Sequence, residues 1–430
     1  MVEYIRLAIA IAAMVCGRAA ASAQPNTAPT KVAITPEQVL SINGTKVFPI
    51  GFTMPPPPDG TTPSGKPALA ELRSAGGLFI RTGPMWEAEG GRKDHAWNSE
   101  WADREKAYMT AAAKVGMYCV PWLKELSEVD AQHPEREDQL RQVVRSFKND
   151  PALLAWKGAD EPQWGNRPVP SLARAQEIIH EEDPDHPVWI VQAPRGTVAE
   201  LKPYNATYDI GGVDVYPVSY PPGVHLAASD TNRDISVIGD YTRKMLRVAE
   251  DRKPIWLTLQ IAFSGTSGRT HPQRFPTFPQ QRFMTYQAII NGARGLVYFG
   301  GGLRSTLPEH DLPYGWNWTY WERVLRPVIE EVGNKGPLAD ALCAGNSGLS
   351  VQAQGSQIEF CVREVGRDVF LLACCRDPQK TAEVQFSGLP NDVDAGEVLF
   401  ESPRTVSAKH GAFTDWFAPY DVHVYRFVRR

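Results

Sequence analysis

The sequence predicts an α/β protein, a (β/α)8 TIM barrel that is followed by a small C-terminal antiparallel β-sandwich. Three observations favour this fold class. Short apolar segments alternate with amphipathic segments eight times between residues 47 and 332, as the strands and helices of such a barrel do. No glycine-rich phosphate loop follows the first strand, which disfavours a doubly wound dinucleotide-binding sheet. After residue 346 the helical pattern stops and short alternating strands follow.

The barrel is predicted to begin with a hairpin around Asn43-Gly44, which leads into a strand over residues 47–52. Each later strand is short and apolar and follows a segment with helical periodicity. The last helix is predicted over residues 320–332. In chain order, the intervening helix and strand pairs are PALAELRSAG and GLFIRTG, SEWADREKAYMTAAAKVG and MYCVPWL, REDQLRQVVRSFKND and ALLAWKGAD, SLARAQEIIHEED and PVWIVQA, TVAELKPY and DIGGVDVYPV, DYTRKMLRVAED and PIWLTLQIAF, and QQRFMTYQAIINGA and GLVYFGG.

The sandwich is predicted from short alternating segments that Gly, Pro, Asn or Asp residues separate. We expect this module to pack on the barrel helices as a stabilising cap, and carbohydrate binding is the alternative function. The segments are LSVQAQ, QIEFCVRE, DVFLLACC, AEVQFSG, GEVLFES and DVHVYRFV.

The N-terminal residues have the pattern of a secretory signal peptide. Arg6 precedes the apolar stretch Leu7–Val15, and a cleavage site of small residues ends at Ala23. This pattern predicts a secreted or periplasmic protein. The apolar stretch is shorter than the roughly 20 residues that span a bilayer, so no membrane partner is expected. The predicted regions are a signal peptide over 1–23, a linker over 24–35, the barrel over 36–340 and the sandwich over 341–430.

Composition and charge exclude several classes of function. A formal net charge of −4 provides no basic surface for a nucleic-acid partner. Of six cysteines, Cys16 lies in the signal peptide, and the odd number that follows has no close CxxC spacing, so neither a disulfide framework nor a zinc site is predicted. No cofactor fingerprint is present, and we predict no metal and no cofactor. Oligomeric state has no sequence signal. The histidines His186, His271 and His310 have no metal-site spacing.

Polar side chains follow the apolar strands at the face where (β/α)8 barrels build their active sites. The segment LLAWKGADEPQW places two adjacent carboxylates, Asp160 and Glu161, at the end of the fourth strand. Candidates at the ends of other strands or in the loops that follow are Arg81, Trp122, Gln192, Asp214, Tyr216, Gln260, Trp316 and Trp318.

The two adjacent carboxylates can take different roles. Neighbouring side chains at a strand end point in different directions, so one can face a cavity while the other binds a nearby group. Pro162 keeps Glu161 out of the helical conformation. An apolar, aromatic-lined cavity raises the pKa of a carboxyl, and a carboxyl that is neutral near pH 7 can protonate a leaving oxygen. We therefore predict Glu161 as a general acid. The alternative is an Asp-Glu-Pro turn that only caps the next helix.

Several segments resemble the large clan of retaining (β/α)8 glycoside hydrolases, which includes cellulases, mannanases and β-galactosidases. The resemblance covers roughly residues 40–335 and rests on INGTKVFPIGF, LRSAGGLFIRTG, NDPALLAWKGADEP, KPIWLTLQ and ARGLVYF. The C-terminal APYDVHVYRF is similar to the last strands of the β-sandwich that such enzymes often carry. The resemblance implies a carbohydrate substrate. By position, it makes Glu161 the acid/base, Arg81 the arginine that steadies the nucleophile, and Tyr216 the aromatic residue that contacts it.

Two positions depart from the pattern of this clan. Asp160 stands where asparagine is usual, and Gln260 stands where the seventh strand supplies the nucleophilic glutamate. Because a glutamine cannot act as a carboxylate nucleophile, another group must supply the second carboxylate. Asp214 is the first candidate, as a base that activates water with Tyr216 beside it. Alternatively, Asp160 holds a substrate acetamido group, so that the substrate attacks its own anomeric carbon. The remaining candidates are the loop residues Glu87 and Glu125.

The aromatic and amide candidates are expected to bind the sugar itself. Gln260 could line the cavity and hydrogen-bond a sugar hydroxyl, or it could satisfy loop backbone at the strand end. No more than two tryptophans are expected to stack on a sugar ring, and the candidates are Trp122, Trp164, Trp316 and Trp318. The sequence thus predicts a secreted glycoside hydrolase that cleaves an oligo- or polysaccharide, with Glu161 as general acid. The alternative is a catalytically inactive carbohydrate-binding barrel, which Gln260 favours.

Overall fold

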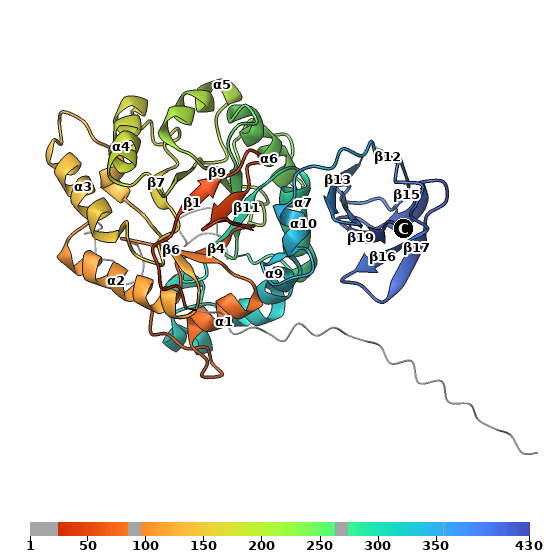
Figure 1. Cartoon of the computed structure of the whole chain (residues 1–430), viewed down its shortest axis with the longest axis horizontal. Coiled ribbons are helices and arrows are strands. Elements are labelled where there is room, and N and C mark those ends of the chain that lie inside the picture. The colour runs from red at the N-terminus through yellow and green to blue at the C-terminus, as the bar shows by residue number, and fades with distance from the viewer. Residues whose placement is uncertain (1–24, 85–95, 263–273, 356) are drawn as a thin grey trace, which may run out of the picture.

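The computed structural model describes residues 25–84, 96–262, 274–355 and 357–430. The predicted signal peptide, Glu87 and His271 lie outside these ranges. Within them the chain forms a barrel of strands surrounded by helices, and a β-rich domain beside it (Figure 1). The predicted fold class is confirmed. None of the helices in the described ranges has the length and apolar character that a membrane span requires.

The barrel is a ring of parallel strands. Six of them form one sheet in the order β6-β5-β4-β11-β10-β9, and β7 pairs with β8. Isolated parallel bridges join Trp122 to Lys157 and Gln192 to Val213. These bridges connect the β7–β8 pair to β6 and to β9, so the strands close into a ring. The bounds are β4 (Ile50–Thr53), β5 (Phe79–Thr82), β6 (Tyr118–Pro121), β7 (Trp156–Asp160), β8 (Val188–Val191), β9 (Gly211–Val215), β10 (Ile255–Gln260) and β11 (Gly295–Phe299).

Helices surround the ring and bury their apolar faces against it (Figure 1). Side-chain caps define several helix starts: Asn98 accepts a hydrogen bond from the backbone of Trp101, and Thr277 forms a capping box with Gln280. The α-helices are α1 (Ala68–Ala75), α2 (Ser99–Lys114), α3 (Glu135–Phe147), α4 (Val169–Glu182), α5 (Val198–Leu201), α6 (Val237–Val248), α7 (Phe278–Ile290), α8 (Trp318–Tyr320), α9 (Arg326–Val332) and α10 (Ala339–Cys343). Shorter helical turns are η1 (Lys124–Ser127), η2 (Lys202–Thr207), η3 (Arg304–Thr306), η4 (Glu309–Tyr314) and the π-helical η5 (Trp321–Leu325).

Three aromatic rings fill the interior of the barrel near the N-terminal ends of its strands. Phe79, Trp189 and Trp256 come from the N-terminal halves of their strands, and the ring centroid of Trp256 lies 5.3 Å from that of Phe79 and 5.6 Å from that of Trp189. Glycines make room for these rings. A Cβ at Gly51 would lie 2.2 Å from the ring of Phe79, and one at Gly295 would lie 2.6 Å from that of Trp256. The packed layer restricts any cavity to the C-terminal ends of the strands.

Within the predicted linker over residues 24–35, residues 30–34 are folded against the barrel, which corrects the prediction for these residues. Thr30 Oγ1 lies 2.7 Å from Nε2 of His186, a residue that is buried rather than at the surface. Val32 packs in the same apolar cluster as Trp189. The physical reason is that a short antiparallel sheet covers this end of the barrel core. Its strands are β1 (Val32–Ile34), β2 (Leu40–Ile42) and β3 (Thr45–Val47).

The C-terminal domain consists of two antiparallel sheets around a separate apolar core. One sheet has the order β12-β15-β18 and the other the order β13-β14-β19-β16-β17. The helix α10 crosses the predicted boundary between residues 340 and 341. The strands are β12 (Gln352–Gln354), β13 (Ile358–Val365), β14 (Asp368–Cys375), β15 (Ala382–Ser387), β16 (Ala395–Leu399), β17 (Arg404–Ser407), β18 (Phe413–Phe417) and β19 (Val422–Val428).

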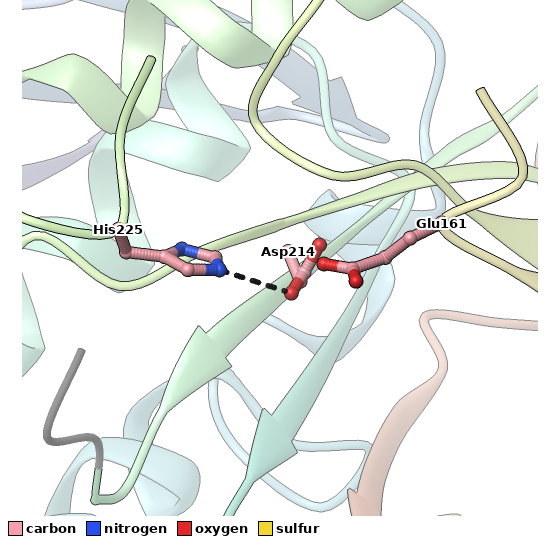
Figure 2. A group of neighbouring side chains, drawn as sticks. All are labelled: Glu161, Asp214 and His225. Atoms are coloured by element: carbon pink, nitrogen blue, oxygen red, sulfur yellow. Dashed lines mark ion pairs between the residues drawn. The ribbon is translucent and has the colours of Figure 1, made fainter. Parts of the chain in front are cut away.

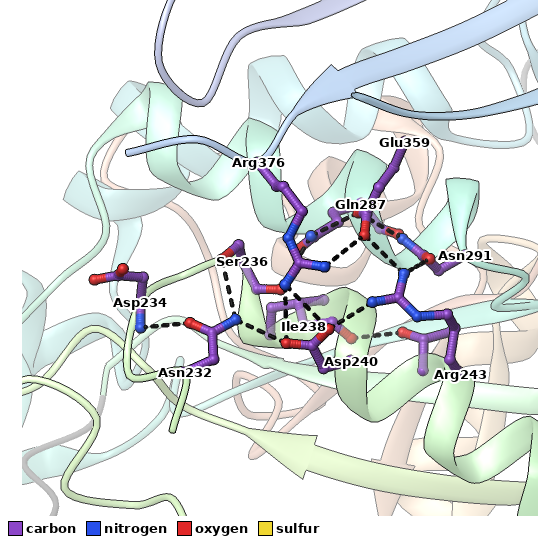
Figure 3. Close-up of polar contacts among 11 residues, drawn as sticks. Asn232, Asp234, Ser236, Ile238, Asp240, Arg243, Gln287, Asn291, Glu359 and Arg376 are labelled. Atoms are coloured by element: carbon purple, nitrogen blue, oxygen red, sulfur yellow. Dashed lines mark hydrogen bonds and ion pairs between the residues drawn. The ribbon is translucent and has the colours of Figure 1, made fainter. Parts of the chain in front are cut away.

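Paired charges join this domain to helices α6 and α7 of the barrel (Figure 3). Glu359 on β13 accepts hydrogen bonds from Arg243 at 2.7 Å and from Asn291 at 3.0 Å. Arg376, just after β14, donates to both oxygens of Asp240 at 3.1 and 3.0 Å. We call Asp240, Arg243, Gln287, Asn291, Glu359 and Arg376 the interface cluster.

Candidate active site

A cavity of about 430 Å³ opens at the C-terminal ends of the barrel strands. Five of the residues predicted from strand ends line it together: Arg81, Asp160, Glu161, Asp214 and Tyr216. Strands β5, β7 and β9 thus deliver these side chains to one place, as the barrel geometry requires. The other lining residues are Thr53, Lys157, Trp164, Trp189, Val191, Arg195, Val224, His225, Thr258 and Phe299.

The carboxyls of Glu161 and Asp214 point toward each other in this cavity (Figure 2). One oxygen from each and one ring nitrogen of His225 all lie within 4.8 Å of one another. Two acidic groups this close to each other favour the state in which one of them carries a proton. Asp214 is 7% exposed, whereas Glu161 is half-buried at the edge of the cavity.

The backbone of Glu161 is held in an unusual conformation. Its φ of +47° lies in the left-handed region, which residues other than glycine rarely adopt. Its N–H donates to the carbonyl of Val191 on the neighbouring strand at 2.7 Å, and its own carbonyl accepts from Gly165 at 2.9 Å. Strained backbone that surrounding contacts enforce is a feature of functional sites. These contacts aim the side chain at Asp214 rather than along the next helix.

The pKa values of the pair are shifted in the same direction. Burial, followed by the negative charge of Asp160, raises the pKa of Glu161. Burial, followed by the charge of Glu161, raises the pKa of Asp214 well above its ordinary value. Two carboxyls this close cannot both ionise easily. The pair therefore retains a proton at a pH where isolated carboxyls have lost theirs.

Asp160 faces cations. Its Oδ1 lies 3.0 Å from Nζ of Lys157, whose side chain is 1% exposed. Burial acts in the opposite direction, but the charges of Lys157 and Arg81 hold the pKa of Asp160 below its usual range. The guanidinium of Arg81 lies 4.6 Å from the ring centroid of Trp122, and Lys157 lies 5.6 Å from it. Trp122 was predicted to contact a sugar, but it does not line the cavity. Its ring instead makes cation–π contacts with Arg81 and Lys157.

Tyr216 is held in an aromatic stack. Its ring centroid lies 4.5 Å from that of His225 and 5.1 Å from that of Phe299, with nearly parallel planes. His225 Nε2 lies 3.6 Å from Oδ2 of Asp214. Burial, followed by the charge of Arg195, lowers the pKa of His225 to about 3, so the imidazole is neutral near pH 7. Together with Glu161 and Asp214, it forms a donor set that could hold a metal ion.

The prediction that Gln260 lines the cavity is wrong. Its side chain is completely buried; Oε1 accepts from the backbone N–H of Val218 at 2.9 Å, and Nε2 donates to the carbonyl of Val218 at 2.7 Å. Both polar atoms are therefore used to hold the loop that follows β9. The alternative reading, a strand-end glutamine that satisfies loop backbone, is the one found.

Three other predicted sugar-binding residues also do not line the cavity. Trp316 and Trp318 are fully buried, with ring centroids 4.9 Å apart, and Trp316 packs edge-on against Phe52 in the barrel core. Gln192 is buried, and its Oε1 accepts from the backbone N–H of Gln163 at 3.2 Å. Large rings fill core space wherever the backbone directs them inward, so these residues support the site without reaching it.

The remaining acidic candidate within the described residues, Glu125, binds backbone. Its Oε1 accepts from the N–H of Trp97 at 2.8 Å, and it does not line the cavity. A different glutamate, Glu105 on α2, was not singled out by its sequence. It is buried and accepts hydrogen bonds from Thr82 Oγ1 at 2.6 Å and from the N–H of Gly83 at 2.9 Å. It thereby anchors the chain directly after Arg81.

Three residues of the cavity with titratable side chains, Lys157, Arg195 and His225, also lacked a sequence prediction. Lys157 could have been identified from the sequence, because a lysine inside an apolar, buried strand needs a polar or charged partner. His225 and Arg195 could not, since they come from irregular segments after β9 and β8. Trp164, one of the tryptophans predicted to stack on sugar, lines the cavity and is 58% exposed. The guanidinium of Arg195 lies 5.4 Å from its ring centroid.

Comparison with solved structures supports the fold. The chain is similar to a protein described as a glycoside hydrolase, with 13% identity, a TM-score of 0.61 and coverage of 93% of this chain and 97% of the other. A family 5 glycoside hydrolase from Bacteroides vulgatus has 12% identity, a TM-score of 0.63 and coverage of 93% and 92%. An α-amylase from Anoxybacillus has 12% identity, a TM-score of 0.54 and coverage of 89% and 98%. No protein-family model and no curated protein matches the sequence.

Proposed function

We propose that the protein is a glycoside hydrolase in which Glu161 and Asp214 are the catalytic carboxyls. One observation carries this proposal: two carboxyls whose pKa values are raised lie close together in a cavity at the C-terminal face of a (β/α)8 barrel. Cleavage of a glycosidic bond needs an acid that is still protonated near neutral pH and a carboxylate that faces the developing positive charge. Glu161 and Asp214 together would supply the acid and the carboxylate.

The separation of the carboxyls favours retention of configuration. An inverting pair stands about 6.5–9.5 Å apart, because a water molecule must fit between, whereas a retaining pair stands about 5–5.5 Å apart. One oxygen of Glu161 and one of Asp214 lie within 4.8 Å of each other, which is closer than an inverting pair requires. This favours Asp214 as nucleophile over its predicted role as a base that activates water.

The proposed cleavage reaction uses the proton that the Glu161 and Asp214 carboxyls retain. Burial raises the pKa of Asp214 more strongly than that of Glu161, so the mechanism requires that the proton pass to Glu161, the more exposed member, when substrate binds. Glu161 then donates this proton to the glycosidic oxygen as the bond from that oxygen to the anomeric carbon breaks, and Asp214 is left ionised. Asp214 forms a bond to the anomeric carbon. Glu161, now ionised, removes a proton from water as the water oxygen displaces Asp214, which restores the pair.

Asp160 is proposed as a substrate-binding group. Its side chain is 45% exposed to the cavity although Lys157 and Arg81 balance its charge. An ionised carboxylate accepts hydrogen bonds from sugar hydroxyls or from a substrate acetamido group. The second possibility keeps the substrate-assisted route open for sugars that carry that group.

The proposed substrate is an oligo- or polysaccharide, and the proposed place of action is outside the cytoplasm. The signal-peptide pattern of residues 1–23 supports this location. The C-terminal sandwich is proposed as a stabilising cap, because its β13 and β14 regions bind α6 and α7 through the interface cluster.

Hydrolysis of aryl glycosides and of plant and microbial polysaccharides tests the proposal. We expect wild type to hydrolyse at least one of them and Glu161→Gln to lose activity about 10³-fold, as removal of a general acid does. Glu125→Gln is the matched control and should retain activity. NMR of the first product formed should show retained anomeric configuration. Equal hydrolysis by wild type and Glu161→Gln would overturn the assignment.

A binding protein without turnover is the second candidate. The buried Gln260 favours it, because the seventh strand, at the position where the resembled clan carries its nucleophile, offers an amide that is fully engaged by Val218. For this candidate, calorimetry should detect saccharide binding to both wild type and Glu161→Gln, and neither protein should release product.

A further inference from the structure

A second cavity of about 570 Å³ adjoins the candidate active site. Trp164 and Arg195 line both cavities, so the two are neighbours across these side chains. The second cavity also contains Lys244 and Glu200, and its other lining residues are uncharged polar residues or glycine. A ligand bound at Glu161 and Asp214 can therefore extend over Trp164 into a polar space.

The second cavity has an excess of positive charge. Glu200 is committed to the start of α5, where its carboxylate accepts from the N–H of Thr197 at 2.7 Å and from Oγ1 of Thr197 at 2.9 Å. The cations Arg195 and Lys244 contact aromatic rings, those of Trp164 and Tyr241. In the part of the chain that the structure describes, no ion pair within 4.0 Å involves Arg195 or Lys244, although the charges of Asp230 and Glu200 act on Lys244 from a greater distance.

The loop that carries Arg195 is held in place. Oη of Tyr241 lies 2.5 Å from the carbonyl oxygen of Pro194 and 2.5 Å from Oδ2 of Asp230, and its one proton serves one of these acceptors. Gly196 has a φ of +71°, and a Cβ there would lie 3.0 Å from Oε1 of Gln163, so the loop packs closely on the segment after Glu161. A cation presented from a fixed loop loses little conformational entropy when it binds a ligand.

We propose that the second cavity is a subsite for an anionic sugar unit, one that carries a carboxylate or a sulfate group. This inference rests on the proposed function, because the anionic unit would belong to an oligosaccharide whose adjacent glycosidic bond lies at Glu161 and Asp214. The planar guanidinium of Arg195 can donate two parallel hydrogen bonds to such a group, and Lys244 adds a point charge. The exposed ring of Trp164 offers an apolar face to the sugar between the two cavities.

Lys244 is the residue for the test, because it lines the second cavity and not the candidate active site. We would measure binding by calorimetry to Glu161→Gln protein, in which bound saccharide is not cleaved. The probes are trisaccharides from pectin and alginate, which carry carboxylates, trisaccharides from carrageenan, which carry sulfates, and neutral trisaccharides from galactan and mannan. Introducing Lys244→Gln into the Glu161→Gln protein should weaken binding of at least one anionic probe about tenfold. The affinity for the neutral probes should not change. Lys244→Arg should restore most of the affinity.

The control for loss of a positive charge is Lys106→Gln, on the exposed face of α2, which should change nothing. The carboxylate and sulfate arms distinguish the two kinds of anion. Equal affinity for neutral and anionic probes, or no effect of Lys244→Gln on any anionic probe, would overturn the subsite. Failure of the proposed function is a separate result: anionic probes that bind and respond to Lys244→Gln, while wild type cleaves none of them, refute the hydrolase and support the subsite.

Discussion

The interface cluster and the active-site cavity are both built from charged side chains, but their charges are arranged in opposite ways. At the interface Glu359 is bound by Arg243 and Arg376, and the same two arginines bind Asp240. In the cavity, Glu161 and Asp214 face each other, and their pKa values are raised. The first arrangement neutralises each charge locally, whereas the second keeps two like groups together.

The arrangement of the interface cluster suits a structural role, whereas that of Glu161 and Asp214 suits proton transfer. Charges that hold two domains together need partners, because an unpaired buried charge destabilises the fold. Groups that transfer protons need pKa values near the working pH, which burial and like charges provide. Asp160 combines both features, since cations balance it while its side chain remains accessible from the cavity.

The largest expected effect comes from Asp214→Asn. We expect kcat to fall about 10³-fold, because the variant lacks the carboxylate that we propose as the nucleophile. The free energy of unfolding near pH 7 should not fall, since the folded protein holds a carboxyl with a raised pKa less favourably than a neutral amide. The control Asp240→Asn at the interface should show the reverse, with reduced stability and retained kcat. Full activity of Asp214→Asn would contradict the proposed roles.

A second effect concerns Glu105, a buried carboxyl on whose pKa burial is the largest influence, as it is for the cavity pair. Burial raises the pKa of Glu105 to about 7 from 4.5. The folded state therefore binds the proton more tightly than the unfolded state, and the stability that this group contributes at low pH is lost as pH rises from about 4.5 to about 7. The shift corresponds to about 3 kcal/mol.

Urea denaturation at about pH 5 and about pH 8 measures this loss. Glu105→Gln should lose less stability than wild type between the two values, because the amide does not ionise. If both proteins lose the same amount, Glu105 is not the group that titrates.

The smallest effect is expected at the interface itself. Glu359→Gln removes the charge that Arg243 and Arg376 share but keeps the shape of the side chain. We expect about 1–3 kcal/mol of destabilisation, the usual range for a lost charged hydrogen-bond partner, with kcat unchanged. Glu383→Gln, on the exposed face of β15, is the control. If Glu359→Gln lowers the free energy of unfolding no more than Glu383→Gln does, the paired charges at the interface stabilise the protein no more than a surface charge does, which contradicts the prediction.

Several features of the site could be predicted from the sequence because they depend on local pattern. Asp160 and Glu161 end an apolar strand before Pro162, and in a (β/α)8 barrel the end of such a strand must reach the active-site face. The same rule placed Arg81 and Asp214. The rule identifies positions along the chain and does not say which side chains turn inward.

Other features could not be predicted because the same residue type serves two purposes. Trp316 and Trp318 fill the core, whereas Trp164 is exposed at the cavity, and nothing in their neighbouring residues distinguishes them. Gln260 ends its strand in the same way as Asp160, yet it binds the backbone of Val218. His225 joins the site only because its loop folds back over Tyr216.

The sequence by itself determined the alternation of strands and helices, the change to a β-sandwich and the strand ends that carry acids, because periodicity and turn residues act over short distances along the chain. Only the tertiary structure decided which acids meet, which rings remain exposed and which amides are already engaged. Those outcomes depend on packing and on electrostatic interactions between segments far apart in sequence. Closure of the ring brought one oxygen of Glu161, which directly follows β7, and one of Asp214 on β9 within 4.8 Å of each other.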